Sequence, residues 1–263
     1  MAYTTIDDPT IYFTTLARSS TGGGSDVSYD IGFQPDLIWD KVRSTSGVHS
    51  LFDSVRGVGA SGKIIYSHNS NAESTNGLIK SIDSSGFTVE STADHSGETI
   101  VDWCWKESAT AGFDIVSYTG NGSARTISHS LSAVPKFMLV KDRTASNTNR
   151  WATYHPVMGN THTMYLELDN AKADESYWND TTPTSSVFSV SNEEIVNKNT
   201  STYIAYLFAD VQGFSKFGSY TGNGNADGAF VYTGFRPAYV MVKRVVDAHN
   251  WWIWDNKRDP ENL

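Results

Sequence analysis

With 263 residues, of which 39% are hydrophobic and 13% aromatic, the chain can build packed cores, which argues against a disordered polymer. Its net charge of −9 comes from scattered acidic residues, and the lack of a clear basic patch argues against a nucleic-acid partner. No apolar run approaches the roughly 18 residues of a membrane-spanning helix, and residues 1–5 lack the features of a secretory signal.

Short segments rich in aromatic and β-branched residues alternate with turns of glycine, asparagine and serine, a pattern typical of strands. In chain order, the clearest of these segments are residues 113–118, 137–141, 163–168, 187–190 and 203–208. The run 137–140 is continuously apolar, which favours a central strand with both faces covered. Helical spacing is almost absent, and one short helix is expected around residues 170–177. The chain is therefore predicted to be all-β.

One motif occurs three times, a proline followed six positions later by a lysine at the end of an apolar run. The copies are Pro35 with Lys41, Pro135 with Lys141, and Pro237 with Lys243. The prolines are 100 and 102 residues apart. Solenoid repeats of roughly 20–50 residues cannot bury a core alone, whereas a unit of about one hundred residues can. The spacing therefore predicts a tandem array of small domains.

The repeat divides the chain into three units, residues 1–110, 111–211 and 212–263. The hexapeptide Ser-Tyr-Thr-Gly-Asn-Gly at 117–122 returns at 219–224, whereas Arg18 stands at the place of its tyrosine in the first unit. The first unit is the most divergent, and we expect that it could serve as an attachment unit. About seven short strands per hundred residues predict tandem β-sandwich repeats of jelly-roll or lectin-like type.

The third unit is partial, and two explanations are open. Either the array continues in a longer chain, or the half-unit completes the sheets of the second unit. The segment 255–260 looks like an interrupted domain and favours the first explanation.

Several sequence motifs resemble nucleotide-binding or catalytic sites but lack residues that such sites need. The glycine-rich segment 57–63 has the spacing of a phosphate-binding loop, but Ile64 follows where Ser or Thr is needed, and a strand follows instead of a helix. Neighbouring carboxylates such as Glu193 and Glu194 would point to opposite faces of a strand. The single cysteine, Cys104, is expected to be a buried hydrophobe. We predict no catalytic residue, no cofactor and no metal site, and hence no enzyme.

The aromatic cluster Trp251-Trp252-Ile253-Trp254 is the strongest candidate for a contact surface. On one strand, Trp252 and Trp254 share a face, while Trp251 and Ile253 share the other. One face would fill the core. The other would be exposed, packed on a neighbouring domain or subunit, or stacked on a sugar ring. Aromatic residues recur at this place in the other units, which favours a core role. The three tryptophans are retained as candidate carbohydrate or subunit contacts.

The segments 112–141 and 213–260 resemble a repeated domain found in virion proteins of marine and aquatic tailed bacteriophages, which are described only as tail-fiber-like. The resemblance covers residues 110–263 well and the first unit weakly. It implies a structural component of the virion, in a tail fiber or tail-associated appendage, that mediates assembly and host-surface contact. The protein would be assembled in the host cytoplasm. The implied partners are other virion proteins of the tail, collar or capsid and a host surface glycan. A homo-oligomer such as a trimer is also expected, because symmetric self-association is common in such arrays.

Two alternatives remain open from the sequence. A capsid decoration protein would use the same sandwiches to clamp shell subunits. A carbohydrate-binding or polysaccharide-degrading tailspike module would need exposed aromatic rings or two suitably spaced carboxylates, and the sequence offers no clear carboxylate pair.

Overall fold

A computed structural model describes residues 4–20, 24–91, 97–144 and 150–258, and nearly all of its regular structure is β. The helical exceptions in these ranges are a 3-10 turn, η1 (Pro9–Ile11), and one short helix, α1 (Glu194–Asn197). The predicted all-β class is confirmed. The helix expected over 170–177 is wrong, because β15 (Ala173–Asp174) pairs there with β14 (His162–Tyr165). Pairing with an existing sheet outweighs the weak helical preference of this segment.

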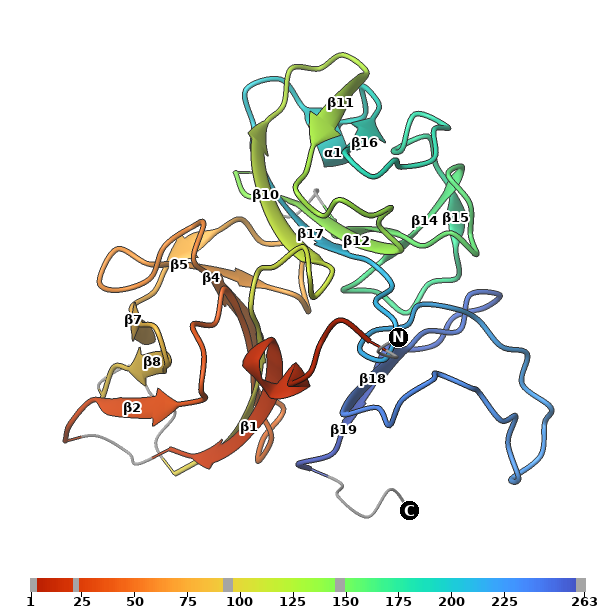
Figure 1. Ribbon diagram of the computed structural model, residues 1–263. Helices are drawn as coiled ribbons and strands as arrows, with labels where there is room; N and C mark the ends of the chain where they lie inside the picture. The colour runs from red at the N-terminus through yellow and green to blue at the C-terminus, as the bar shows by residue number, and fades with distance from the viewer. Residues whose placement is uncertain (1–3, 21–23, 92–96, 145–149, 259–263) are drawn as a thin grey trace.

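The first unit contains a six-stranded antiparallel sheet and a smaller three-stranded one (Figure 1). The larger sheet has the order β1 (Phe13–Ser19), β9 (Thr99–Trp105), β3 (Leu37–Val42), β4 (His49–Asp53), β5 (Lys63–Tyr66), β6 (Ser74–Thr75). The smaller sheet has the order β2 (Val27–Asp30), β8 (Gly86–Val89), β7 (Ile79–Ile82).

The second unit has the same strand order in its larger sheet, and its smaller sheet has two strands instead of three. Its larger sheet has the order β10 (Phe113–Thr119), β17 (Thr202–Phe208), β12 (Phe137–Asp142), β13 (Ala152–Tyr154), β14, β15. Its smaller sheet pairs β11 (Arg125–Ser128) with β16 (Val187–Val190). The third unit contributes β18 (Tyr239–Val242) and β19 (Trp252–Asp255), which pair with each other. In the described ranges neither strand joins another sheet, so the half-unit does not extend the sheet of the second unit.

Each large sheet has apolar residues on both faces, because successive side chains of a strand point to opposite sides. On β3, Leu37 and Trp39 point into a central core, while Ile38 packs under the smaller sheet of its own unit. On β12, Leu139 joins the same central core, while Met138 packs under the smaller sheet of the second unit. The prediction that the segment 137–140 is a strand covered on both faces is confirmed.

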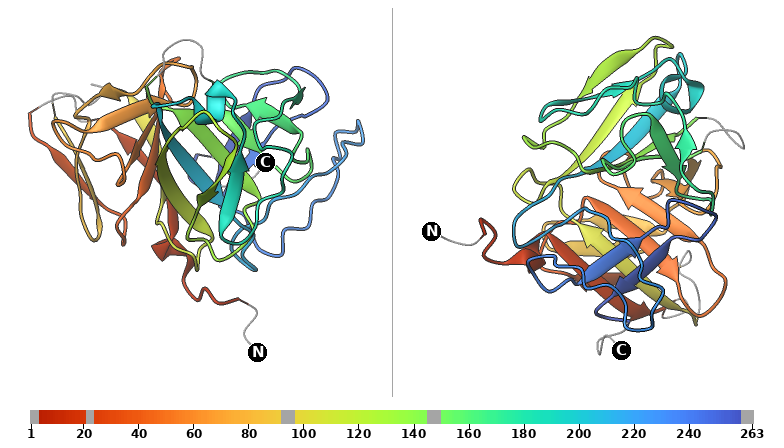
Figure 2. Two further views of the ribbon diagram at one scale, coloured as in Figure 1. Left: turned by 90° about the horizontal axis from the view of Figure 1, so that it is seen from above. Right: turned by 90° about the vertical axis from the view of Figure 1, so that its right-hand side faces the viewer.

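The central core is shared by all three units, whose sheets surround it (Figures 1 and 2). The third unit adds residues that pack against this core, namely Tyr239, Met241, Trp251 and Ile253. The ring of Tyr239 lies 5.7 Å from that of Trp103 in β9 and 5.5 Å from that of Trp105. The first and third units are therefore in direct aromatic contact.

The joints between successive units are built from equivalent hydrogen bonds. The indole of Trp151, just before β13, donates to the carbonyl of Tyr66, the last residue of β5, at 2.9 Å. The indole of Trp251, just before β19, donates to the carbonyl of Tyr165, the last residue of β14, at 3.0 Å. The second unit therefore docks on the first as the third docks on the second.

The repeated lysine of the sequence motif belongs to the same joints. The ammonium of Lys141 donates to the carbonyl of Ser70, four residues after β5, at 3.2 Å. The ammonium of Lys243 donates to the carbonyl of Asp169, four residues after β14, at 3.1 Å. Each lysine thus anchors its unit to the preceding one. Lys41, in the first unit, donates to carbonyls of its own unit instead.

A buried ion pair closes the joint between the first and second units from the other side. Asp53, at the end of β4, accepts a hydrogen bond from Nε of Arg56. Asp53 Oδ2 also accepts a hydrogen bond from the hydroxyl of Tyr206 in β17, at an O–O distance of 2.6 Å. Asp53 and Arg56 both belong to the first unit, so Tyr206 makes the contact between the units through its hydrogen bonds with this buried pair. Losing a hydrogen bond to a buried charge is costly, so the contact fixes how the two units meet.

The third unit repeats this contact on the first. Asp255, at the end of β19, accepts hydrogen bonds from the guanidinium of Arg258 and, at 3.1 Å, from the indole of Trp103 in β9. Trp103 and Tyr206 occupy equivalent places, the fifth residues of β9 and β17. The first unit meets the second in the same way as the third meets the first.

Candidate binding surface

The structure separates the three candidate tryptophans onto two faces. Trp251 and Ile253 pack against the central core. Trp252 and Trp254 lie on the opposite face and are 57% and 46% exposed. Their rings are parallel within 13°, with centroids 5.8 Å apart, so they stack on each other. Val240 of β18, directly opposite Trp254 in the pairing, is also exposed. We call Val240, Trp252 and Trp254 the open face.

The counterparts of the open face are buried in the other two units. Pairing places Tyr154 opposite Met138, and Phe52 opposite Ile38, as Trp254 is placed opposite Val240. Tyr154 is only 2% exposed, and its ring meets that of Trp178 at 5.7 Å. In both units the smaller sheet supplies the cover. The open face is thus the side of the third unit that corresponds to a core.

The backbone edge of β18 is open as well. In the first sheet β3 lies between β4 and β9, and in the second β12 lies between β13 and β17. β18 pairs with β19, and within the described residues no strand takes the place of β9 or β17. An unpaired edge presents backbone donors and acceptors that another strand can use.

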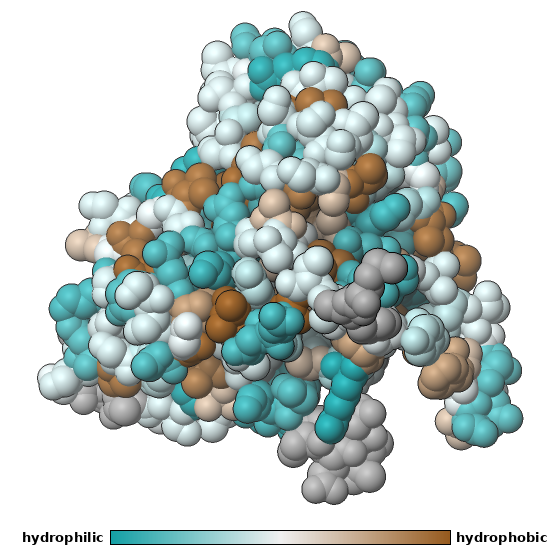
Figure 3. Space-filling model, in the orientation of Figure 1, coloured by the Kyte–Doolittle hydropathy of each residue, from teal (hydrophilic) through white to brown (hydrophobic). Residues whose placement is uncertain are grey.

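The segment that leads into β18 carries further exposed aromatic rings. Phe230 is 89% exposed and Tyr232 is 76% exposed. Residues 218–232 are all exposed and form no strand, and this blue loop stands away from the rest of the molecule (Figures 1 and 3). In the second unit the corresponding stretch forms β10 and β11, each paired with a strand from later in that unit.

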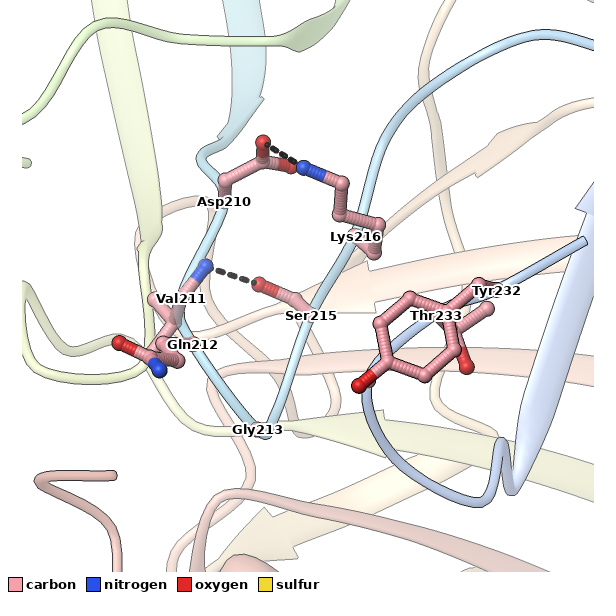
Figure 4. A pocket seen from close by; sticks show the side chains of 9 residues that line it. Asp210, Val211, Gln212, Gly213, Ser215, Lys216, Tyr232 and Thr233 are labelled. Carbon is pink, nitrogen blue, oxygen red and sulfur yellow. Dashed lines mark hydrogen bonds and ion pairs between the residues drawn. The ribbon is translucent and has the colours of Figure 1, made fainter. Parts of the chain in front are cut away.

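Two hollows lie close to the third unit. The first, of about 370 Å³, is lined by loops on either side of the exposed segment (Figure 4). Its carboxylate, Asp210, pairs with Lys216 at 3.0 Å, and the hydroxyl of Ser215 accepts from the backbone of Val211. The carboxylate of Asp210 is paired with Lys216 and does not contact the hydroxyl of Ser215. The side chains that line this hollow can therefore form hydrogen bonds with a ligand, but they do not form a nucleophile–base pair.

The second hollow, of about 330 Å³, lies where the three units meet. Trp39, His49 and Glu167 line it, together with Trp251. The indole of Trp39 is 3.2 Å from Nδ1 of His49, and burial lowers the pKa of this histidine to about 3. Burial also raises the pKa of the Glu167 carboxyl. Sequence reasoning missed this hollow, because its residues come from all three units and share no local motif.

The remaining sequence motifs lie in ordinary structural surroundings. Cys104 is fully buried, and burial raises the pKa of its thiol, so the expected role as a buried hydrophobe is confirmed. In the glycine-rich segment 57–63, residues 57–62 form a loop and Lys63 begins β5. In the described ranges, no group of three or more His, Cys, Asp or Glu side chains is placed to hold a metal ion, and no helix is long and apolar enough to cross a bilayer.

Comparison with protein families gives one match, a domain of unknown function designated DUF7483, over residues 8–263. The chain belongs to the DUF7483 family. No curated protein and no solved structure matches the chain. The matched span includes the third unit, so the open face is part of the DUF7483 domain itself.

Proposed function

We propose that this DUF7483 protein is a structural component of a tailed-phage virion, in a tail fiber or tail-associated appendage that mediates assembly and host-surface contact. The observation that supports this proposal most is the way the units are joined. Trp151 and Trp251 dock successive units through equivalent hydrogen bonds. Such joints build a rigid block of three units around one core, and the open face offers it a contact surface. The resemblance of 112–141 and 213–260 to phage virion domains points the same way.

We further propose that the first two units are copies of one β-sandwich module of jelly-roll or lectin-like type. The identical strand orders of their larger sheets support this, as do the smaller sheets that cover one face of each large sheet. The first unit, residues 1–110, remains our candidate for attachment to other virion proteins of the tail, collar or capsid. Its large sheet shares a core with the second unit, so attachment has to be tested by surface substitutions and not by deleting the unit.

The test is the location of the protein on intact particles. Antibodies raised against the purified chain, used for immunogold labelling of phage, should mark the tail or its fibers. Label on the head would replace the proposal with the alternative of a capsid decoration protein. Particles that carry no label would refute both. Analytical ultracentrifugation of the purified chain would test the proposed homo-oligomer, for which a trimer is the expected state.

The alternative of a carbohydrate-binding tailspike module is favoured by the exposed rings of Trp252 and Trp254. It predicts binding on a glycan array that is lost in Trp254→Ala and kept in Phe230→Ala, an exposed aromatic residue outside the open face. Degradation of polysaccharide is not proposed. The buried carboxylates Asp40 and Asp102 both accept hydrogen bonds from Arg18, which explains their presence without catalysis. A reducing-sugar release assay on host polysaccharide is expected to be negative.

A further inference from the structure

We propose that the third unit binds one polypeptide segment with the chemistry of residues 187–208, which adds a strand to the edge of β18 and covers the open face. The proposal does not depend on a place in the virion. It rests on three separate features of the third unit that lack a partner in the described ranges, and on the fact that one continuous segment supplies all three partners in the second unit.

The first feature is the edge of β18. β17 pairs with β12 over six residues, from Phe137 opposite Phe208 to Asp142 opposite Tyr203. β9 pairs with β3 in the same register, from Leu37 opposite Trp105. A strand added to β18 would therefore run antiparallel to it, with its last aromatic residue opposite Tyr239. Strand addition to an open sheet edge is a common mode of peptide recognition.

The second feature is the open face. In the second unit, Phe188 and Val190 of β16 belong to the core that buries Met138 and Tyr154, the counterparts of Val240 and Trp254. β16 precedes β17 by only a short link that contains α1. The same segment that fills the edge thus also covers the face. Burying two tryptophans is a large hydrophobic gain.

The third feature is the exposed hexapeptide 219–224. In its second-unit copy, Tyr118 stacks on Tyr203 with ring centroids 5.0 Å apart, and its hydroxyl donates to the carbonyl of Val196 at 2.6 Å. The side-chain oxygen of the buried Asn197 accepts a hydrogen bond from the backbone N–H of Asn121 at 3.1 Å. All three partners lie between residues 196 and 203. A segment of this kind would order the loop of the third unit as well.

The two filled sheets define the sequence of the occupant. β9 and β17 both begin with threonine and carry aromatic residues at their fifth and seventh positions. The fifth-position rings, Trp103 and Tyr206, point into the central core. A second copy of this chain is a poor donor of such a strand, because β9 and β17 are each held between two neighbours in their own sheets. The occupant is therefore a free segment with this pattern.

The experiment adds a synthetic peptide of the sequence 187–208, labelled with a fluorophore, to the full chain. We expect saturable one-to-one binding by fluorescence anisotropy, a blue shift of tryptophan emission, and a rise of about 5 °C in the thermal midpoint at saturation. The matched control peptide carries proline at the position of Ile204, which lies opposite Lys141 in the pairing of β17 with β12. The backbone of this residue faces the partner strand, so proline removes a donor from the new pairing and should weaken binding at least tenfold.

Two protein variants locate the site. Trp254→Ala should weaken peptide binding at least tenfold, whereas Val157→Ala, an exposed apolar residue of the second unit, should leave it unchanged. If the peptide aggregates on its own, the segment 187–208 is instead joined to Leu263 through a flexible Gly/Ser linker, with the proline version as control.

Several results would overturn the proposal. One is equal behaviour of the parent and proline segments in both formats. Another is a dimer of the free protein whose tryptophan emission does not change on adding peptide, since a second copy would then occupy the face. A glycan that binds the open face while the peptide does not would assign the surface to sugar. None of these results depends on where the protein lies on a particle.

Discussion

The same six residues, Ser-Tyr-Thr-Gly-Asn-Gly, end in two different structures in this molecule. At 117–122 they close the strand β10 and lie against β17 and α1. At 219–224 they are exposed and form no strand. Because the sequences are identical, the difference comes from the neighbours. Strand formation here depends on a partner strand more than on local propensity.

One property of the hexapeptide is the same in both places. The last glycine has a φ of 71° at Gly122 and 69° at Gly224, so both copies make the turn. The turn is thus specified locally, because glycine adopts a positive φ at no steric cost. The comparison separates what six residues can specify from what the rest of the unit must supply.

The largest expected difference in stability is between Tyr154, buried under the smaller sheet of the second unit, and Trp254, its exposed counterpart in the third unit. Tyr154→Ala should lower the free energy of unfolding by about 3–5 kcal/mol, because it removes a buried aromatic ring and leaves a cavity. Trp254→Ala, at the equivalent and exposed position, should change it by no more than about 1 kcal/mol. Guanidinium unfolding measures both. Equal losses would mean that the open face is already covered in solution.

A smaller difference is expected at the third-last residue of the hexapeptide. A Cβ added to Gly120 would lie 2.1 Å from the carbonyl oxygen of Lys198, whereas a Cβ on Gly222 meets nothing within 4 Å. Gly120→Ala should therefore cost about 1–3 kcal/mol, through forced displacement of backbone. Gly222→Ala should stay within about 0.5 kcal/mol. Thermal unfolding of the two variants checks this. A large loss of stability from Gly222→Ala would show that another segment packs against Gly222 in solution.

Much of the strand content was predictable, because the apolar segments carry their own pattern. The segments 113–118, 137–141, 187–190 and 203–208 all contain the expected strands. The placement of Arg18 at the position of the repeat tyrosine is also confirmed. Arg18 pairs with Ile100, the second residue of β9, as Tyr118 pairs with the second residue of β17.

The sequence could not show how the units meet. Lys141 and Lys243 occupy the same place in the repeat, but both donate to backbone carbonyls. A pattern of side chains in the sequence does not reveal such partners. The sequence placed Trp251 and Trp252 on opposite faces, yet which face is open depends on the layer that covers it. The hollow lined by His49 and Glu167 could not be predicted, since it is formed only where three units converge.

The smallest expected effect tests whether the turn is local. Gly224→Ala places a side chain at a positive φ, which costs about 1 kcal/mol. The loop is exposed, so global stability should barely change. Instead, the hydrogen bond from the backbone of Asn225 to the side chain of Asn223 should open more often. Amide exchange at Asn225 should then speed up about fivefold.

The matched control for Gly224→Ala is Gly228→Ala, in the same loop, where an added Cβ meets nothing and the φ is not positive. It should leave exchange at Asn225 unchanged. At the buried copy, Gly122→Ala carries the same conformational cost, but there the turn is tied to Asn197. The cost should therefore appear in global unfolding, at about 1 kcal/mol. If exchange at Asn225 did not respond to Gly224→Ala, the turn would not be fixed by its own residues. The two copies would then share a shape only because each is held by the surrounding chain.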